Sequence, residues 1–230
     1  MKIREKREDM HFMVDKYILG KVASYSEEGK TALEIGPGHG ELTRLLKGRV
    51  IAVEKDRGMA SDLREWFKDN RRIQIIHGNA LEELDGLDFD MIISNTPYSI
   101  LEPLAKKLAR IEKPAYLTVP AGFFGSVERL PLIFACKKLF DIPKSAFDPP
   151  PKTRSVFCMI EPGNSILRAA LKRKGKLKNE VRRALFDSRK MTKKQAGQTI
   201  KDLVPKHLQE KRVSDLDLKD LTELQNPKLK

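Results

Sequence analysis

The chain has 230 residues, of which 40% are hydrophobic and 33% are charged, and its formal net charge is +13. This length suits one medium-sized domain with a smaller second domain. No apolar run approaches the roughly 18 residues of a membrane span, and no signal peptide precedes the first motif. Two cysteines, Cys136 and Cys158, are too few for a disulfide framework or a zinc site. We therefore expect a cytoplasmic protein with neither a membrane span nor a metal.

The positive charge is concentrated toward the C-terminus. Residues 166–230 contain 19 Lys and Arg against 8 Asp and Glu, so nearly all of the excess lies in this segment. Such an asymmetry is typical of proteins that bind a polyanion, above all a nucleic acid. The alternative is a solvated, Lys-rich helical surface like those of heat-adapted proteins, but the clustering favours nucleic acid.

The stretch 31–43 organises the rest of the chain. Its apolar run, 32–35, predicts a buried strand, and 41–46 predicts the start of a helix. Between them lie three glycines at alternate positions, Gly36, Gly38 and Gly40. Glycines let a backbone approach a ligand closely, and the N–H groups of a helix start point at that ligand. The spacing G-x-G-x-G differs from the G-x-G-x-x-G of dinucleotide sites, so we expect a ligand without a pyrophosphate.

Two acidic residues accompany this glycine-rich loop. Glu34 lies just before the loop, and Glu54 ends the next apolar run. Folds of this kind place a ribose-binding carboxylate about 20 residues after the loop, which is the position of Glu54. The alternative is a tight turn between strand and helix that binds no ligand. The presence of Glu54 favours a cofactor site.

The first 120 residues alternate between expected strands and expected helices. The expected strands are 32–35, 50–54, 73–77, 91–94 and 115–119. The expected helices are 16–25, 41–46, 59–70 and 101–110. This alternation of helices with near-continuous apolar strands predicts an α/β fold whose mostly parallel sheet is covered on both faces. In such sheets ligands bind beyond the carboxyl ends of the strands.

Residues 120–160 follow a different pattern. The segment 120–125 shows no clear period, and 130–140 predicts a helix. A proline-stiffened loop, 145–155, leads into an expected strand at 156–160. This strand and another around Ile142 are expected to finish the sheet as an antiparallel pair.

A domain boundary is predicted at Pro162-Gly163. Residues 1–163 then form the α/β domain, and residues 164–230 form a small basic domain that is all helical. The expected helices of the second domain are 167–172, 176–189, 192–204 and 218–224.

The stretch Asn95-Thr96-Pro97-Tyr98 directly follows the fourth expected strand. The side-chain oxygen of Asn95 and a backbone carbonyl can accept hydrogen bonds from an exocyclic amine, which orients the lone pair of that nitrogen toward an electrophile. Pro97 stiffens the loop, and Tyr98 offers a face on which a base can stack. Enzymes that modify a base hold it extruded in this way. The alternative is an ordinary turn built on Asn and Pro, but the combination with G-x-G-x-G favours base chemistry.

Two further positions keep two interpretations open. Asn79 follows the third expected strand, where its amide either accepts a bond from a cofactor's adenine amine or belongs to a turn without a ligand. Phe147 lies on a rigid loop that also carries the cations Lys152 and Arg154. Its ring either closes over a base from the side opposite Tyr98 or packs in the core.

Six cations of the basic segment lie within 13 residues and can bind phosphates in a salt-dependent way that is blind to sequence. They are Arg182, Arg183, Arg189, Lys190, Lys193 and Lys194. The alternative is an exposed helix face. The four histidines are scattered without metal-ligand spacing, so no metal site is expected.

These motifs resemble those of the ribosomal RNA adenine N6,N6-dimethyltransferases of the KsgA type, which share their catalytic domain with the Erm methylases. Residues 10–15 resemble the family's G-Q-N/H-F-L-x-D, and residues 34–43 match its first motif almost verbatim. Residues 78–81 correspond to G-D-A-L, residues 95–98 to N-L-P-Y, and residues 147–155 to F-x-P-x-P-K-V-x-S. The resemblance runs nearly end to end, because the basic helical segment is also similar to the family's C-terminal domain.

The resemblance implies a Rossmann-like class I methyltransferase sheet, S-adenosylmethionine as methyl donor, and an adenine of ribosomal RNA in a subunit precursor as acceptor. Asn95 and Pro97 would orient the target amine, while Tyr98 and Phe147 would sandwich the base. The implied cofactor-binding residues are His11, Met13, Glu34, Gly36, Gly38, Glu54, Lys55, Asn79, Ala80 and Asn95. Lys152, Arg154 and the six clustered cations would bind RNA, and a monomer is expected.

Several positions depart from the family pattern. The usual Gln and Asp are replaced by Met10 and Asn79, and the stretches Leu101-Glu102 and 120–125 also differ. These changes surround the target pocket rather than the cofactor loop. Three functions therefore stay open: dimethylation of small-subunit RNA, methylation of large-subunit RNA, and an RNA-binding assembly factor with little or no catalysis.

Overall fold

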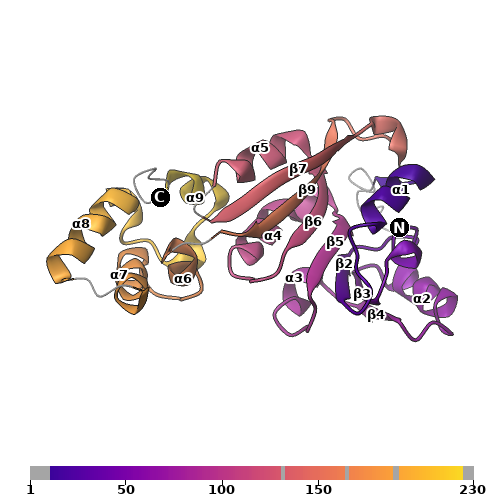
Figure 1. Cartoon of the computed structure of the whole chain (residues 1–230), viewed down its shortest axis with the longest axis horizontal. Helices are drawn as coiled ribbons and strands as arrows, with labels where there is room; N and C mark the ends of the chain where they lie inside the picture. The colour runs from indigo at the N-terminus through magenta and orange to yellow at the C-terminus, as the bar shows by residue number, and fades with distance from the viewer. Residues whose placement is uncertain (1–10, 131–132, 164–165, 189–191, 225–230) are drawn as a thin grey trace, which may run out of the picture. The chain divides into compact units, whose positions relative to one another are not determined.

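The computed structural model describes residues 11–130, 133–163, 166–188 and 192–224 (Figure 1). By their contacts, the residues fall into two compact units. The first comprises residues 1–104, 113–124 and 137–160, and the second comprises 105–112, 125–136 and 161–230. The predicted division into domains after residue 163 remains a prediction.

The main sheet has seven strands in the order β4-β3-β2-β5-β6-β9-β7, and most of it belongs to the first unit. Its strands are β2 (Thr31–Ile35), β3 (Arg49–Glu54), β4 (Ile73–His77), β5 (Met91–Asn95), β6 (Ala115–Pro120), β7 (Phe134–Ile142) and β9 (Ser155–Pro162). The five strands from β2 to β6 pair in parallel, and β9 is antiparallel to β6. The mostly parallel α/β sheet is therefore confirmed, and its first five strands lie within one residue of the expected bounds.

Three helices connect successive parallel strands, α2 (Arg57–Trp66), α3 (Ala80–Glu83) and α4 (Leu101–Leu108). Helix α1 (Lys16–Ala23) precedes β2, and α5 (Ala121–Glu128) follows β6. Side-chain oxygens cap three of the helix starts, because Asp15, Asp56 and Asn79 each accept hydrogen bonds from backbone N–H groups of the turn that follows. Four residues of α1 are buried, and they lie on one face at helical spacing, Ile18, Leu19, Val22 and Ala23.

A second, two-stranded sheet lies apart from the main sheet. It pairs β1 (Phe12–Met13) with β8 (Phe147–Asp148) in antiparallel register. Beside it, the backbone N–H of Val14 donates to the carbonyl oxygen of Ala146 at 2.8 Å. These bonds join the start of the chain to the proline-rich loop. Met13 and Phe147 then enter the same buried cluster as residues of β2, β3 and α1.

Two expectations of local structure are wrong. The expected helix 130–140 contains the start of strand β7. Residues 121–125, whose sequence shows no clear period, belong to helix α5. Apolar residues of β7 recur at two- and three-residue spacings, so periodicity alone does not separate helix from strand there. The expected helix 41–46 is reduced to a three-residue 3₁₀ turn, η2 (Thr43–Leu45), because β3 begins only a few residues later.

The second unit contains the C-terminal helices (Figure 1). They are α6 (Ile166–Leu171), α7 (Leu177–Ser188), α8 (Lys193–Leu203) and α9 (Leu218–Glu223), each within one residue of its expected bounds. Short 3₁₀ turns, η5 (Lys206–Leu208) and η6 (Val213–Asp215), connect α8 to α9. Capping boxes begin α8 and α9, where Thr192 pairs with Gln195 and Asp217 with Asp220.

Gly48 lies in the short connection between β2 and β3, and its substitution tests whether that connection requires glycine. Its φ of +65° lies in the left-handed region, and a Cβ there would clash with the carbonyl oxygen of Lys30 and lie 2.6 Å from that of Glu27. We expect Gly48→Ala to lower the free energy of unfolding by roughly 2–4 kcal/mol. The matched control is Gly20→Ala in α1, where a Cβ meets nothing within 4 Å; this change should raise stability by about 0.5–1 kcal/mol. Urea unfolding measures the free energy of unfolding of both variants. Equal changes in Gly48→Ala and Gly20→Ala would contradict the claim that a side chain at position 48 strains the turn.

Candidate active site

A cavity of about 480 Å³ lies at the carboxyl ends of β2, β3 and β5. These strands are neighbours, and the chain order reverses between β2 and β5, which is the switch point where open α/β sheets bind ligands. All ten residues predicted to bind a cofactor line this cavity, as do Pro97 and Tyr98. The structure therefore brings the two halves of the predicted site into one space.

The glycine-rich loop forms one wall of the cavity. Gly36 has a φ of +65°, and a Cβ on it would lie 3.0 Å from the Pro97 ring. Gly38 has a φ of +59°, and its Cβ would lie 2.9 Å from the Phe12 ring. Glycine is thus required by backbone conformation and by the close approach of two other segments. The loop packs against the predicted catalytic stretch before any ligand is considered.

Glu54 is 7% exposed at the end of β3. Its Oε2 accepts a hydrogen bond from the backbone N–H of Gly38 at 3.3 Å, and its Oε1 accepts from that of Asp56 at 2.8 Å. A carboxylate has about four acceptor positions, so two bonds leave capacity for hydroxyl donors. The bonds also fix the carboxylate against the glycine-rich loop, as a ribose-binding acid requires.

Glu34 is 2% exposed, and its Oε2 has no hydrogen-bond partner among the described residues. Burial raises the pKa of this carboxyl to about 8, and the carboxylates of Glu41 and Glu54 act in the same direction. The Thr43 hydroxyl lies close enough to lower this pKa in part, although the geometry falls short of a hydrogen bond. A buried acceptor without a partner that lines a cavity is suited to a cationic group.

Asn95 ends β5, and its Nδ2 donates to the backbone carbonyl oxygen of His11 at 3.0 Å. Because a carbonyl only accepts, the amide nitrogen must face His11. The bond leaves the Oδ1 atom of Asn95 as an acceptor for another group. The amide orientation that an amine-binding role needs is therefore set by the protein itself.

Tyr98 is held from two sides. Its hydroxyl forms a 2.6 Å hydrogen bond with Oγ of Ser155, which is fully buried at the start of β9. The His11 ring lies beside the tyrosine ring with centroids 5.6 Å apart. Burial raises the pKa of the Tyr98 phenol, so its hydroxyl stays protonated near neutral pH. The ring is thus placed as a fixed wall of the cavity.

Phe147 and Asn79 differ from the simplest expectation. Phe147 is 3% exposed, packs in the buried cluster with Met13, and is not among the residues that line the cavity. A base-stacking role would require its ring to leave the core. Asn79 lines the cavity, but its Oδ1 accepts from the N–H of Leu81 at 3.2 Å and its Nδ2 donates to Glu82. This amide therefore already caps helix α3.

Sequence reasoning missed several positions of the candidate site. Phe12 packs against Gly38 of the glycine-rich loop, and its ring contacts that of His39 in a tilted arrangement with centroids 4.5 Å apart. Ser155 supports Tyr98, although only its place in the family motif drew attention to it. Asp56 and Ile100 also line the cavity. Distance along the chain hides such partners, because Ser155 lies 57 residues from Tyr98.

The positions that depart from the family pattern have structural roles in part. Leu101 is 4% exposed at the start of α4, and Glu102 follows it in the first turn of that helix. Residues 120–125 end β6 and begin α5. Met10 lies outside the described residues.

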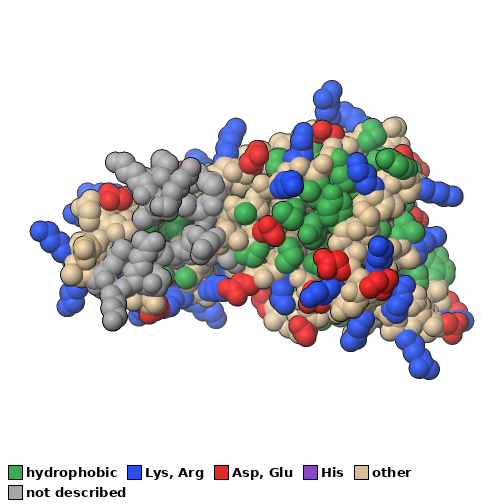
Figure 2. Space-filling model, viewed as in Figure 1, with side chains coloured by type: hydrophobic (Ala, Val, Ile, Leu, Met, Phe, Trp, Pro, Cys, Tyr) green, Lys and Arg blue, Asp and Glu red, His purple; other side chains and the backbone are tan. Residues whose placement is uncertain are grey.

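The predicted RNA-binding cations divide into two groups. Arg183 forms an ion pair with the buried Glu180 at 2.9 Å. Arg182, Lys193 and Lys194 are exposed and form no ion pair with a described residue. Lys and Arg side chains also project around the edge of the C-terminal helices (Figure 2). Lys152 and Arg154 are exposed in the first unit, while Arg189 and Lys190 lie outside the described residues.

Within the described part of the chain, no three His, Cys, Asp or Glu side chains are grouped so as to hold a metal ion. None of the described helices combines the length and apolarity that crossing a bilayer demands.

Glu34 makes the stability of the fold depend on pH. Burial raises the pKa of Glu34 from 4.5 to about 8 in the folded protein, so its contribution to the free energy of unfolding is complete below pH 4.5 and is lost as pH rises toward 8. We expect Glu34→Gln to gain stability over the wild type by up to about 1.4 kcal/mol per pH unit in that window. Urea unfolding at pH 5, 6.5 and 8 measures the difference. A difference that stays constant across these pH values would contradict a buried, protonated Glu34.

The chain is similar in sequence to known proteins. The chain is 34% identical to the ribosomal RNA small subunit methyltransferase A of Thermosynechococcus vestitus, over 71% of each protein. It is 28% identical to the probable enzyme of the same name from Methanococcoides burtonii, with 95% of this chain and 91% of that protein covered.

Solved structures agree with the fold. A dimethyladenosine transferase from Plasmodium falciparum superposes with a TM-score of 0.60 and 25% identity, covering 93% of this chain and 96% of that one. The 23S rRNA methyltransferase ErmE superposes with a TM-score of 0.58 over 92% of this chain and 98% of its own, at 18% identity, so it supports the fold alone. The model of the family described as ribosomal RNA adenine dimethylase matches residues 4–173, and the chain therefore belongs to that family.

Proposed function

We propose that this protein transfers methyl groups from S-adenosylmethionine to N6 of an adenine in ribosomal RNA, and that it dimethylates RNA of the small subunit. The observation that carries the proposal is the fixed amide of Asn95, which lines the same cavity as the glycine-rich loop and Glu54. Membership of the adenine dimethylase family and the names of the relatives support the choice of substrate.

The residues around the cavity fit S-adenosylmethionine. Glu54 would hold the ribose hydroxyls, and Asn79 and Ala80 would contact the adenine. The Oε2 atom of Glu34, which has no hydrogen-bond partner among the described residues, would accept from the cationic methionine end, beside Gly36 and Gly38. His11, Met13 and Lys55 line the same space. When bound, S-adenosylmethionine supplies a methyl group on a strongly electrophilic sulfonium.

The protein itself needs to contribute position and electrostatics rather than a nucleophile. Asn95 Oδ1 accepts a hydrogen bond from the adenine N6 amine and so orients its lone pair. Pro97, packed against Gly36, fixes the loop that carries Asn95 and Tyr98. Tyr98 offers its ring to the base, and its bond to Ser155 prevents the ring from turning away. A second base-stacking group in the position expected for Phe147 remains part of the proposal.

Ribosomal RNA in a subunit precursor would be the partner. The exposed Lys152 and Arg154 of the first unit and the exposed Arg182, Lys193 and Lys194 of the second can each bind phosphates. We propose that the protein acts as a monomer, without a metal, in the cytoplasm.

A second candidate function is an RNA-binding assembly factor with little catalysis. The burial of Phe147 favours it, because one wall of the expected base sandwich is absent from the cavity. Biological function that survives Asn95→Ala intact would establish this candidate over the enzyme.

Methyl transfer is expected to depend on Asn95. Removing the amide in Asn95→Ala should lower kcat/KM by about 10²–10³-fold, because the amine is no longer oriented. Asn95→Asp keeps an acceptor oxygen but loses the bond to His11, so its activity should lie between that of the wild type and that of Asn95→Ala. Incubation with labelled S-adenosylmethionine and undermodified ribosomal subunits, followed by mass spectrometry of the RNA, measures the effect and locates the nucleotide. Absence of transfer by the wild type to either subunit, with the cofactor bound normally, would refute the enzymatic function.

Cofactor binding should release a proton. In the protein without cofactor, the Glu34 carboxyl has a pKa of about 8 and is mostly protonated at pH 7. A cationic group beside it favours the ionised form and lowers that pKa. Calorimetry at pH 7 in buffers of different ionisation enthalpy should show release of up to one proton for each cofactor bound. Glu34→Gln should bind with no such release. Equal proton release by the wild type and Glu34→Gln would show that Glu34 does not bind the cationic end of the cofactor.

A further inference from the structure

Two segments that support the cavity also form an outer surface beside it. The first runs from β1 into the first turn of α1, and the second is the loop 144–154. They are joined by the β1–β8 ladder and by the bond between Val14 N and Ala146 O. The His11 ring adds a bond from Nδ1 to the carbonyl oxygen of Pro149 at 2.8 Å. The surface is thus one connected piece of the first unit.

Apolar side chains are exposed on this surface. Tyr17 is 76% exposed and is the most exposed of the large hydrophobic residues described, and Val14 is 49% exposed. Tyr17 lies off the buried face of α1, which is formed by Ile18, Leu19 and Val22. Its backbone N–H is used in the Asp15 cap, but its ring does not enter the core. The fold therefore does not account for an aromatic residue at this position.

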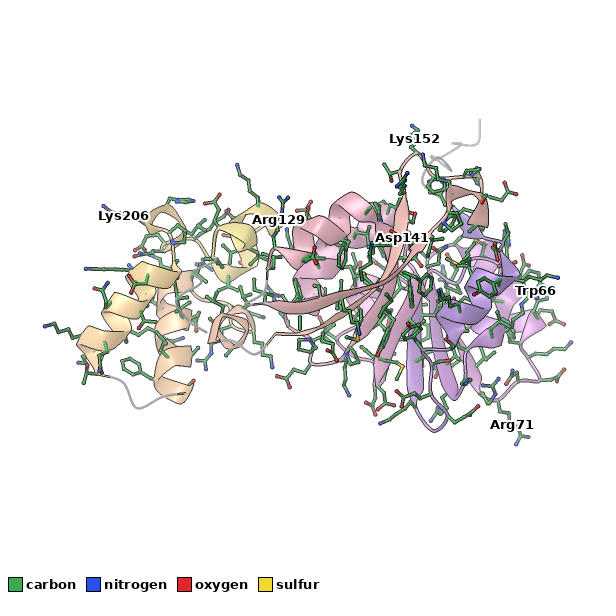
Figure 3. All side chains as sticks on the ribbon, turned by 45° about the horizontal axis from the view of Figure 1, so that its top comes forward. Trp66, Arg71, Arg129, Asp141, Lys152 and Lys206 are labelled. Atoms are coloured by element: carbon green, nitrogen blue, oxygen red, sulfur yellow. The ribbon has the colours of Figure 1, made fainter. Side chains whose placement is uncertain are left out.

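Exposed cations lie on the same two segments as Tyr17. Lys16, Lys144, Lys152 and Arg154 are all exposed on the two segments. Lys144 Nζ donates to the backbone of Lys152, which ties the ends of the loop together. Figure 3 shows Lys152 projecting outward from the ribbon. The other exposed charge of the loop is the single carboxylate of Asp148, so the surface is positive overall.

The same segments hold the predicted catalytic side chains. His11 accepts the bond from Asn95, and Ser155, directly after Arg154, holds the Tyr98 hydroxyl. A polynucleotide with one base in the cavity must continue past the residues that form its rim. An exposed aromatic ring among cations is the combination that binds an unpaired strand, since rings stack bases and cations follow phosphates.

We propose that Tyr17, supported by Val14 and the cations of 144–154, stacks an unpaired base adjacent to the target adenine. This subsite rests on the proposed function, because it assumes that an RNA base enters the cavity. It binds single-stranded RNA and not the duplex, since a paired base is stacked on its own neighbours. It also stabilises the extruded state of the target, because the flanking base exchanges its stack in the RNA for one on the protein.

The test measures RNA binding by the full-length protein without the cofactor, so it is independent of methyl transfer. The probe is a short fluorescein-labelled single-stranded oligoadenylate, with a labelled RNA duplex beside it. Tyr17→Ala should bind the single strand about 5- to 100-fold more weakly, and Tyr17→Phe should bind like the wild type because stacking does not need the hydroxyl. Trp66→Ala is the matched control, because Trp66 is an aromatic residue of the same unit that is 58% exposed and belongs to α2 rather than to either segment (Figure 3). This variant should leave the affinity unchanged.

The cations have a separate readout. Lys152→Ala and Arg154→Ala should each lower the slope of log affinity against log salt by about 0.7. With undermodified subunits as substrate, Tyr17→Ala should raise KM and leave kcat near the wild-type value, because the contact is equal in ground and transition states.

Three results would overturn the proposal. The first is an RNA affinity of Tyr17→Ala equal to that of the wild type, and the second is a loss of affinity in Trp66→Ala as large as that in Tyr17→Ala. The third is a Tyr17→Ala variant that binds the RNA probe normally but no longer binds intact subunits, which would assign the surface to a protein partner. Failure of the wild type to transfer methyl groups would refute the proposed enzyme but leave the RNA-binding result readable.

Discussion

The hydrogen bond between the Asn95 side chain and the backbone of His11 joins parts of the chain that are 84 residues apart. It connects the N-terminal strand β1 to the end of β5, and β1 is itself paired with β8 in the proline-rich loop. Through Ser155 the same loop reaches Tyr98. Three segments therefore fix one another around the cavity, and each predicted catalytic side chain in the cavity is oriented by a partner from another segment.

The two carboxyl groups beside the glycine-rich loop illustrate how environment decides role. Glu54 accepts hydrogen bonds from two backbone N–H groups, whereas the buried Oε2 of Glu34 has no partner in the described part of the chain. Burial and two neighbouring carboxylates then favour the protonated form of Glu34. Under the proposed function, Glu54 would accept from hydroxyl donors and Glu34 would receive a cation. A cofactor with a ribose at one end and an ammonium at the other would match this division.

The basic C-terminal segment is less uniformly available than its charge suggests. Arg173, Lys176, Lys178 and Lys211 all form ion pairs with acidic residues of the second unit. Such exposed pairs add little stability, but they reduce the local field that phosphates would meet. Arg182, Lys193 and Lys194 carry their charge without a described partner. The sign and location of the positive charge follow from the sequence. Whether a given cation can bind a phosphate depends on which acidic side chains the helices bring next to it.

The sequence by itself determined the parallel α/β sheet, the cofactor loop and the position of Asn95, because these depend on short-range patterns: apolar strands, glycine spacing and a polar residue directly after each strand. The convergence of Glu34, Glu54, Asn79 and Asn95 also followed, since parallel neighbouring strands present their carboxyl ends at one edge. The tertiary structure decided what long-range contacts control. It made β7 a strand by giving it β9 as a neighbour, it shortened the helix after the glycine-rich loop to a single turn, and it buried Phe147 against Met13. It also supplied the unexpected partners His11 and Ser155, because a side-chain hydrogen bond between distant segments leaves no periodic signal along the chain.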